Sequence, residues 1–258
     1  MIEIEKDGEI QIIRFKDKIS LLSLESLEEF RKAVAKADLD EDISAIVISI
    51  GSLAGANLKE LIESDPKSGI RWLESYWSAL SLLRETGKLV VAAVKGDCVA
   101  GGNELVMMCD LVVAGKSARF GQPEIIVGST AMGGGVQLLP LLVGEKRAKE
   151  LLFTARLLSA NEALEWGLIN KVVEDEKVEE EAKKIAREVI EKSSPQAFRV
   201  MKSCINFWTN LAMLNWQIAR DLTAFIWASE EFKERGKDFL EKRKMKPKKF
   251  WGILPKPR

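Results

Sequence analysis

The chain has 258 residues, enough for one large domain with a buried core. Its 39 Lys and Arg residues balance 39 Asp and Glu residues, so no bulk charge draws in nucleic acid or an anionic membrane. It has no histidine, which excludes Ser-His-Asp and Cys-His nucleophile systems and His-ligated zinc. Since Tyr76 is the only tyrosine, acid–base chemistry would fall to carboxylates, lysines or the backbone.

The three cysteines, Cys98, Cys109 and Cys204, are an odd number in apolar surroundings. They indicate buried thiols in a reducing compartment rather than a disulfide framework. In the first residues, MIEIEK, apolar and charged side chains alternate, which is unlike a secretory signal peptide. We therefore expect a cytoplasmic protein.

In chain order, strand-like and helix-like patterns alternate. Alternating or unbroken apolar runs predict strands, the first two joined as a hairpin, at 2–5, 9–15, 45–50, 89–94, 111–114 and 169–173. Helical spacing predicts helices at 23–37, 70–86, 105–108, 136–142, 145–153, 159–164 and 177–192. The small-residue segments 51–60 and 128–135 are predicted to be loops that lead into helices. This alternation favours an α/β fold with parallel strands covered by helices.

The last part of the chain has no strand pattern. Residues 195–244 are predicted to be helical with an unusually broad apolar surface. Residues 203–219 carry no charge, but their Asn and Gln side chains argue against a membrane span. A helix that is apolar nearly all round needs cover on more than one side, so we expect packing on the core and on neighbouring subunits. The basic tail at 241–249 is either a solvated end or a phosphate contact.

Residues 99–105, VAGGNEL, stand between a strand-like run and a short helix. Two adjacent glycines let the backbone approach a ligand closely, and the N–H groups of a helix start favour a negatively charged oxygen. Glu104 follows in the first turn, and Glu124 is a second candidate carboxylate in the segment 120–125, FGQPEI. An acidic residue in a first turn also complements the helix dipole without any catalytic role, so this pattern alone leaves both explanations open.

Five segments resemble the enoyl-CoA hydratase/isomerase (crotonase) family in their order and spacing. They are LAGANLKE at 53–60, AGGNELVMMCD at 100–110, FGQPEI at 120–125, SANEALEWGLI at 159–169 and FLEKR at 239–243. The resemblance covers nearly the whole chain. It implies an α/β core at 1–194, built as a crotonase-like spiral of ββα units, and a helical C-terminal trimerisation region at 195–258. A homotrimer or homohexamer is therefore expected.

The resemblance also implies an acyl-CoA thioester as substrate, with no metal and no cofactor beyond the coenzyme A of the substrate itself. The N–H groups of Ala56 and Gly101 would hold the thioester oxygen in an oxyanion hole, where each donor is typically worth about 3–4 kcal/mol. Glu104 and Glu124 match the two glutamates of family hydratases. We assign Glu104 as the base that activates water and Glu124 as the acid that protonates C2, an order that the sequence leaves open.

Five further positions match substrate contacts in the family. They are Ala54, Lys59, Gly102, Met132 and Lys242, the last expected to reach in from a neighbouring subunit. The two lysines fit ordinary surface positions equally well.

Some residues depart from the family pattern. Asn57 stands where relatives commonly have Asp, Ala100 replaces the first of three usual glycines, and Met132 takes a position that hydratases usually give to glycine. The segment 129–141 is somewhat similar to ring-opening hydrolases for cyclic oxo-enoyl-CoA.

The pair of glutamates favours an enoyl-CoA hydratase acting on a trans-2-enoyl-CoA. One alternative is another crotonase-family enzyme, such as an isomerase or a cyclic acyl-CoA hydratase or hydrolase. A different class of alternative is a non-catalytic acyl-CoA-binding member.

Overall fold

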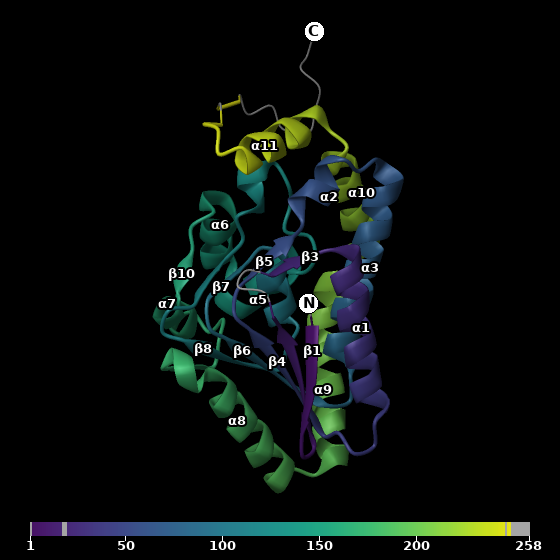
Figure 1. The fold of residues 1–258 in the computed structure, drawn as a ribbon, viewed down its shortest axis with the longest axis vertical. Helices are drawn as coiled ribbons and strands as arrows, with labels where there is room; N and C mark the ends of the chain where they lie inside the picture. The colour runs from purple at the N-terminus through teal and green to yellow at the C-terminus, as the bar shows by residue number, and fades with distance from the viewer. Residues whose placement is uncertain (1, 17–19, 246, 249–258) are drawn as a thin grey trace.

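The computed structural model describes residues 2–16, 20–245 and 247–248, and it confirms the α/β class (Figure 1). One sheet has six strands in the order β1 (Ile2–Asp7), β2 (Ile10–Phe15), β4 (Ala45–Ile50), β6 (Leu89–Val94), β8 (Leu111–Gly115) and β11 (Lys171–Val173). Only β1 and β2 pair antiparallel in this sheet, as the predicted hairpin requires. All six predicted strands are therefore confirmed, with small shifts of their ends.

A second sheet, which the sequence did not predict, has five short strands. Their order is β10 (Leu158–Ser159), β9 (Arg119–Gly121), β7 (Asp97–Val99), β5 (Leu53–Ala56) and β3 (Ser20–Leu22). The prediction that 51–60 is a loop leading into a helix was wrong for the loop, because β5 pairs with β3 and β7, and it was confirmed for the helix by α2 (Leu58–Ile62). Strands of two to four residues are too short to display a periodicity of their own.

The helices follow the two sheets as a repeating unit. The strand pairs β2–β3, β4–β5 and β6–β7 each place one strand in either sheet before the chain enters a helix, which is the predicted spiral of ββα units. The helices of this part are α1 (Leu24–Leu39), α2 (Leu58–Ile62), α3 (Pro66–Glu85), α4 (Gly101–Met107), α5 (Gly135–Val143), α6 (Glu145–Thr154), α7 (Ala160–Glu165) and α8 (Val178–Lys192), with 3-10 turns η1 (Glu124–Val127) and η2 (Asp175–Lys177).

Local signals explain where two of the longest helices begin. Ser23 caps α1 as predicted, and its hydroxyl accepts the Ser26 N–H in a capping box. Helix α3 begins at Pro66, earlier than the predicted 70, because Asp65 and Ser68 form a second capping box.

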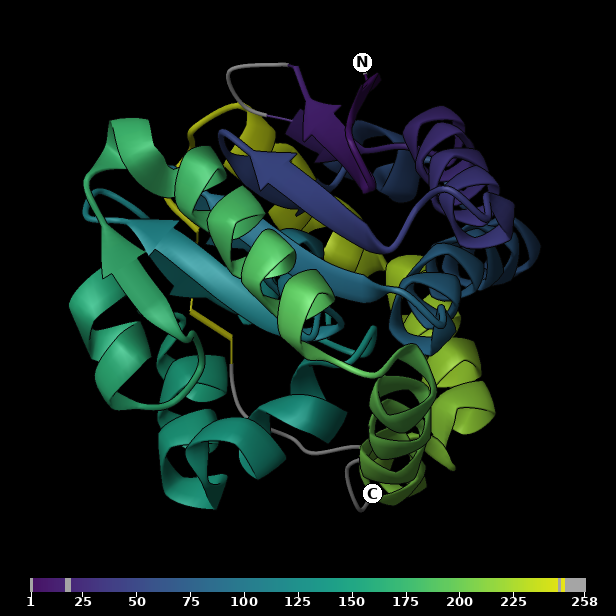
Figure 2. The ribbon, with the colours of Figure 1, turned by 90° about the horizontal axis from the view of Figure 1, so that it is seen from below.

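The core has two layers. One apolar cluster lies between the two sheets and helices α1 and α3, and a smaller one lies between the six-stranded sheet and α8. Figure 2 shows α8 lying over one face of that sheet. Strands β4 and β6 are consequently covered on both faces, and every residue of both is buried.

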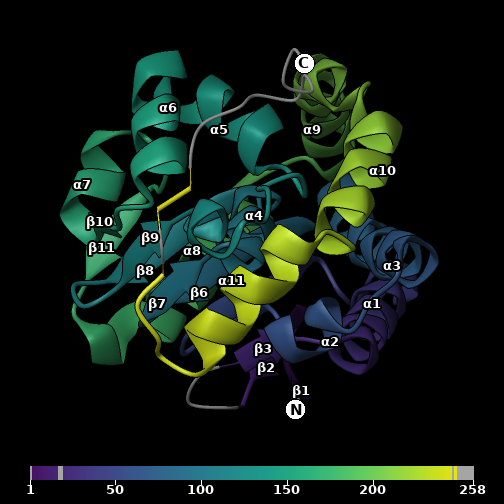
Figure 3. The same ribbon diagram turned by 90° about the horizontal axis from the view of Figure 1, so that it is seen from above.

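The C-terminal region is helical, as predicted, with α9 (Pro195–Asn210), η3 (Leu211–Met213), α10 (Trp216–Trp227) and α11 (Glu230–Leu240). Lys202 ties α9 to the core, since its Nζ lies 2.7 Å from the Asp110 carboxylate and donates to the Lys88 carbonyl. Helix α10 packs on α3, where the rings of Trp77 and Trp216 stack 4.5 Å apart. Helix α11 lies over α2 and η1 (Figure 3).

The outer face of α9 and α10 is apolar and open in the single chain. Its exposed side chains are Val200, Met201, Ile205, Phe207, Trp208, Leu211, Leu214, Ile218, Leu222 and Phe225. The division of the chain at 194/195 stays a prediction, and residues 246 and 249–258 of the expected trimerisation region lie outside the described residues. Across the described ranges, no helix has both the length and the apolar character of a bilayer span.

The prediction of three buried thiols was wrong in one case. Cys98 is buried and Cys109 partly buried, but Cys204 is exposed on α9. Its apolar sequence neighbours suggested burial, but they belong to the open outer face of that helix.

Gly102 fixes the contact between α4 and β5. A Cβ at Gly102 would lie 2.3 Å from the Leu53 carbonyl oxygen, whereas a Cβ at Gly8 would meet nothing within 4 Å. We expect Gly102→Ala to lower the free energy of unfolding by about 2 kcal/mol or more, because the backbone itself must move. Gly8→Ala, which only strains a positive φ, should cost about 1 kcal/mol. Urea unfolding followed by circular dichroism measures both, and equal losses would contradict this account.

Candidate active site

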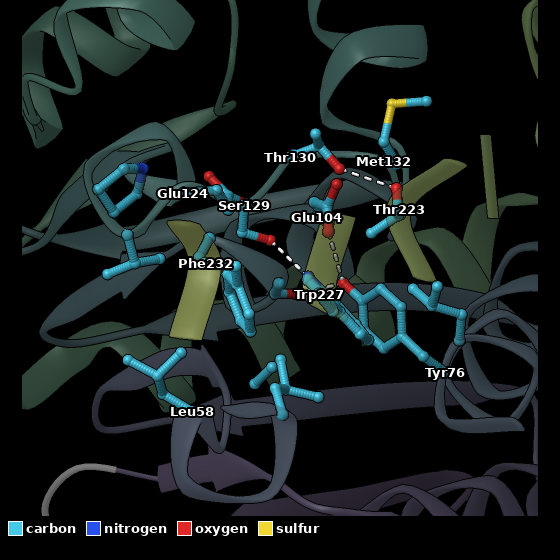
Figure 4. A pocket seen from close by; sticks show the side chains of 18 of the residues that line it. Leu58, Tyr76, Glu104, Glu124, Ser129, Thr130, Met132, Thr223, Trp227 and Phe232 are labelled. Carbon is cyan, nitrogen blue, oxygen red and sulfur yellow. Dashed lines mark hydrogen bonds between the residues drawn. The ribbon is translucent and has the colours of Figure 1, made fainter. Parts of the chain in front are cut away.

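One cavity is bordered by the carboxyl ends of β5 and β7, the starts of α2 and α4, the loop after η1, and helices α10 and α11. Its wall is mostly apolar, with Leu61, Trp72, Leu73, Ile126, Val127, Trp227 and Phe232. A few polar side chains face it, namely Tyr76, Glu104, Glu124, Ser129, Thr130 and Thr223 (Figure 4). An apolar cavity with few polar groups is the usual form of a small-molecule site.

Two backbone segments meet at one wall of this cavity. A Cβ on Gly55 would lie 2.7 Å from the Gly101 nitrogen, so the end of β5 and the start of α4 are nearly in contact. Gly101 is the first residue of α4, and a first helical N–H has no acceptor within its own helix. Ala56 and Gly101 both line the cavity. The two residues predicted to form the oxyanion hole are therefore brought together.

Ala100, just before α4, has φ 52°, a backbone conformation that favours glycine. Its N–H donates to the Gly121 carbonyl at 2.9 Å, and its carbonyl accepts the Glu104 N–H at 3.0 Å. These two bonds hold the strained residue in place and fix the direction of the peptide that leads into Gly101.

Glu104 is buried in the wall of the cavity and accepts hydrogen bonds on both oxygens. The Gly135 N–H donates to Oε1 at 2.8 Å, and the Tyr76 hydroxyl lies 3.0 Å from Oε2. Burial raises the pKa of Glu104 to about 7, although these donors favour the charged form. A carboxyl group with such a pKa can exchange protons near neutral pH.

Glu124 begins the 3-10 turn η1, is half-buried and lines the same cavity. Desolvation and the negative charge of Glu104 raise its pKa well above the usual value. With its amide nitrogen oriented toward Glu124, Gln122 donates to Oε1 at 2.9 Å and to the Ala100 carbonyl at 3.2 Å. The two carboxyl groups thus interact electrostatically, and they titrate as a pair.

The loop after η1 is held by the C-terminal helices. Thr130 and Thr223 share a hydrogen bond of 2.8 Å, and the Trp227 indole N–H donates to Ser129 at 2.7 Å (Figure 4). Arg235 donates to the Ile126 carbonyl at 3.1 Å. Side chains from α10 and α11 therefore shape the wall opposite α4.

The structure gathers six of the nine predicted site residues around the cavity. They are Ala54, Ala56, Gly101, Glu104, Met132 and Glu124. Gly102 packs beneath them against Leu53, and Lys59 and Lys242 are exposed on the surface without lining the cavity. Sequence reasoning missed Tyr76 and Gln122. The only signal for Tyr76 was its rarity, a lone tyrosine on the buried face of a helix.

Comparisons with known proteins show the family of the chain. Residues 5–249 match the family model described as enoyl-CoA hydratase/isomerase. The chain is 32% identical to a short-chain-enoyl-CoA hydratase of Clostridium acetobutylicum, over 94% of this chain and 95% of that protein. It is 33% identical to a crotonyl-CoA hydratase of Syntrophomonas wolfei, over 94% and 96% of the two chains.

Solved structures give the same result for the fold. An enoyl-CoA hydratase/isomerase of Mycobacterium paratuberculosis superposes with a TM-score of 0.85 at 25% identity, covering 92% of this chain and 97% of the other. An enoyl-CoA hydratase subunit of Geobacillus kaustophilus superposes with a TM-score of 0.76 at 32% identity, covering 96% of this chain and 97% of the other. Two sheets wound by ββα units, with acidic side chains facing one cavity, define an enzyme of the crotonase fold. The chain belongs to the enoyl-CoA hydratase/isomerase family.

The raised pKa of Glu104 predicts how stability depends on pH. From about pH 4.5 to about pH 7 the folded state keeps the Glu104 proton that the unfolded chain has lost. Stability therefore falls as pH rises through this window, by up to about 3 kcal/mol. Glu104→Gln keeps the shape and removes the titration, so it should gain stability relative to the parent between pH 5 and pH 8.

Urea unfolding at several pH values measures this difference. Glu60→Gln, which changes an exposed glutamate of α2, is the matched control and should show no such gain. A constant difference between Glu104→Gln and the parent at all pH values would mean that the Glu104 pKa is ordinary.

Proposed function

We propose that this chain is an enoyl-CoA hydratase, which adds water across the 2,3 double bond of a trans-2-enoyl-CoA thioester. The observation that carries the proposal is the composition of the cavity wall. Two interacting carboxyl groups and the first residue of a helix line the same cavity. Relatives named as hydratases of enoyl-CoA and crotonyl-CoA, each about one-third identical, support a hydro-lyase.

The oxyanion hole is assigned to the N–H groups of Ala56 and Gly101. As a nucleophile adds at C3, negative charge moves to the thioester oxygen. Fixed donors aimed at this oxygen stabilise the enolate, by about 3–4 kcal/mol for each donor. The dipole of α4 adds to the Gly101 contribution, because Gly101 opens that helix.

The two glutamates supply the proton transfers. The oxygen of the water bonds to C3 while Glu104 takes a proton from that water. Glu124 gives its proton to C2, so that the product is the 3-hydroxyacyl thioester. This order agrees with the surroundings, because Gly135 and Tyr76 favour ionised Glu104. Glu124 is desolvated beside that negative charge, which favours its protonated form. No metal or redox cofactor enters these steps, and coenzyme A belongs to the substrate.

The remaining substrate contacts are assigned by family position. Ala54 and Met132 line the cavity and would touch the acyl thioester. Gly102 would act through the backbone beside Gly101, and the exposed lysines Lys59 and Lys242 would approach the coenzyme A phosphates. The free thiols favour a cytoplasmic location.

Two single substitutions test the chemistry. Glu104→Gln and Glu124→Gln should each lower kcat for crotonyl-CoA hydration at least 100-fold, because each removes one proton transfer. Loss of absorbance at the conjugated thioester band measures the rate, with Glu60→Gln as the control.

Other outcomes separate the alternatives. An isomerase would convert a 3-enoyl-CoA and keep activity after the loss of one glutamate. A cyclic acyl-CoA hydratase or hydrolase would turn over only cyclic substrates. A binding protein would retain enoyl-CoA without converting any of these compounds, and that result would refute the hydratase.

We further propose that the outer face of α9 and α10 is the subunit interface of a homotrimer or homohexamer. A contiguous apolar face of this kind is rare on a monomer. Leu214 and Leu39 are each 82% exposed, but only Leu214 belongs to this face. Leu214→Glu should shift the molar mass from light scattering toward the monomer, whereas Leu39→Glu should leave it unchanged. Equal masses for both variants would contradict the proposal.

A further inference from the structure

Tyr76, the only tyrosine of the chain, contacts two parts of the proposed site at once. It projects from the buried face of α3 into the cavity wall, and its ring stacks on Trp72. Its hydroxyl lies 3.0 Å from Glu104 Oε2 (Figure 4). It also lies 2.8 Å from the Gly101 carbonyl oxygen. A single side chain therefore joins the residue of the oxyanion hole to the carboxyl group of the assigned base.

The hydroxyl has one proton and two acceptors. When Glu104 is ionised, the hydroxyl donates to Oε2, and this charge-assisted bond is the stronger choice. When Glu104 is protonated, Oε1 still faces the Gly135 N–H, so the acid proton belongs on Oε2. It then points at the Tyr76 oxygen, and the hydroxyl proton turns to the Gly101 carbonyl. The Tyr76 hydroxyl, the Gly135 N–H and the acid proton thus each keep an acceptor in both states.

We propose that Tyr76 is a positioning residue for hydration, whose hydroxyl proton alternates between Glu104 and the Gly101 carbonyl as Glu104 releases and takes up its proton. This inference rests on the proposed function. The carboxyl group keeps one orientation throughout the reaction because its bond to Tyr76 is never lost. The second bond, from the Tyr76 hydroxyl to the Gly101 carbonyl, forms only while Glu104 is protonated, so the link to the oxyanion-hole residue follows the charge of the base.

The alternation predicts that Tyr76 senses the charge of Glu104. Since the chain has no other tyrosine, growth with 3-fluorotyrosine labels this position alone and removes no side chain. Glu124 also acts on Tyr76 through its charge, so its titration adds a separate movement of the fluorine resonance that Glu124→Gln removes. The titration of Glu104 should move the resonance in a step near pH 7. The step should disappear in Glu104→Gln. A resonance that does not respond to pH, or one that responds identically in Glu104→Gln, would overturn the proposal whether or not the chain hydrates crotonyl-CoA.

Tyr76→Phe tests the consequence for catalysis. Loss of a bond to the charged carboxylate should lower kcat about tenfold near neutral pH and change KM less than about twofold. The acid limb of the pH–rate profile should move to higher pH, because the hydroxyl favours ionised Glu104. If the hydroxyl were merely structural, its loss would lower activity equally at every pH and leave the pH of the acid limb unchanged. That outcome would refute the positioning role.

Thr86→Val is the matched control for this variant. It also deletes a buried hydroxyl, at the C-terminal end of α3, where Thr86 bonds Asp38 away from the cavity. It should lower the melting temperature without moving the acid limb. Hydration that is absent from the unmodified protein would refute the proposed function, whereas hydration without the Tyr76 effects would refute only this inference.

Discussion

The close approach of two chain segments is the constraint on which the site depends. Strands β5 and β7 are neighbours in the second sheet, so their carboxyl ends bring Ala56 and Gly101 to the same edge. There is no room for a Cβ at Gly55 or Gly102, which would lie 2.7 Å from the Gly101 nitrogen and 2.3 Å from the Leu53 oxygen. The glycines are therefore required by the contact itself, and the positions of the two amides follow from it.

The carboxyl groups owe their properties to the same construction. Glu104 is on α4, one turn after Gly101, so its position relative to the amides is fixed by the helix. Its surroundings are nearly dry, and a carboxyl group in such surroundings holds its proton more tightly than in water. Glu124 comes from another unit of the spiral and faces the charge of Glu104. Because the two groups interact, ionisation of one favours protonation of the other, which is the state that the proposed addition of water requires.

Sequence reasoning predicted the parts that rest on composition and period. Strands β4 and β6 are nearly unbroken apolar runs because both of their faces are covered, and they were predicted for that reason. The second sheet was missed because its short strands carry glycine, cysteine and charged residues. The two glutamates were candidates from the residues alone, but only the family resemblance favoured a catalytic role, since an acidic residue in a first turn has an ordinary structural explanation. Tyr76 was missed because contact across 25 residues depends on how α3 packs, which no local pattern encodes.

Helix α10 joins the interior of the site to the outside of the molecule. Thr223 and Trp227 are buried and hold the loop that follows η1, whereas Leu222 and Phe225, on the same turns, point outward and are more than half exposed. Burial of apolar surface contributes about 25 cal/mol per Å², so cover on the outer face would stabilise the helix and, through it, the loop. The exposed face and the cavity wall are therefore two sides of one element. In the single chain, packing on α3 and these hydrogen bonds hold α10 in place. The proposed assembly would act on the geometry of the site through the same helix.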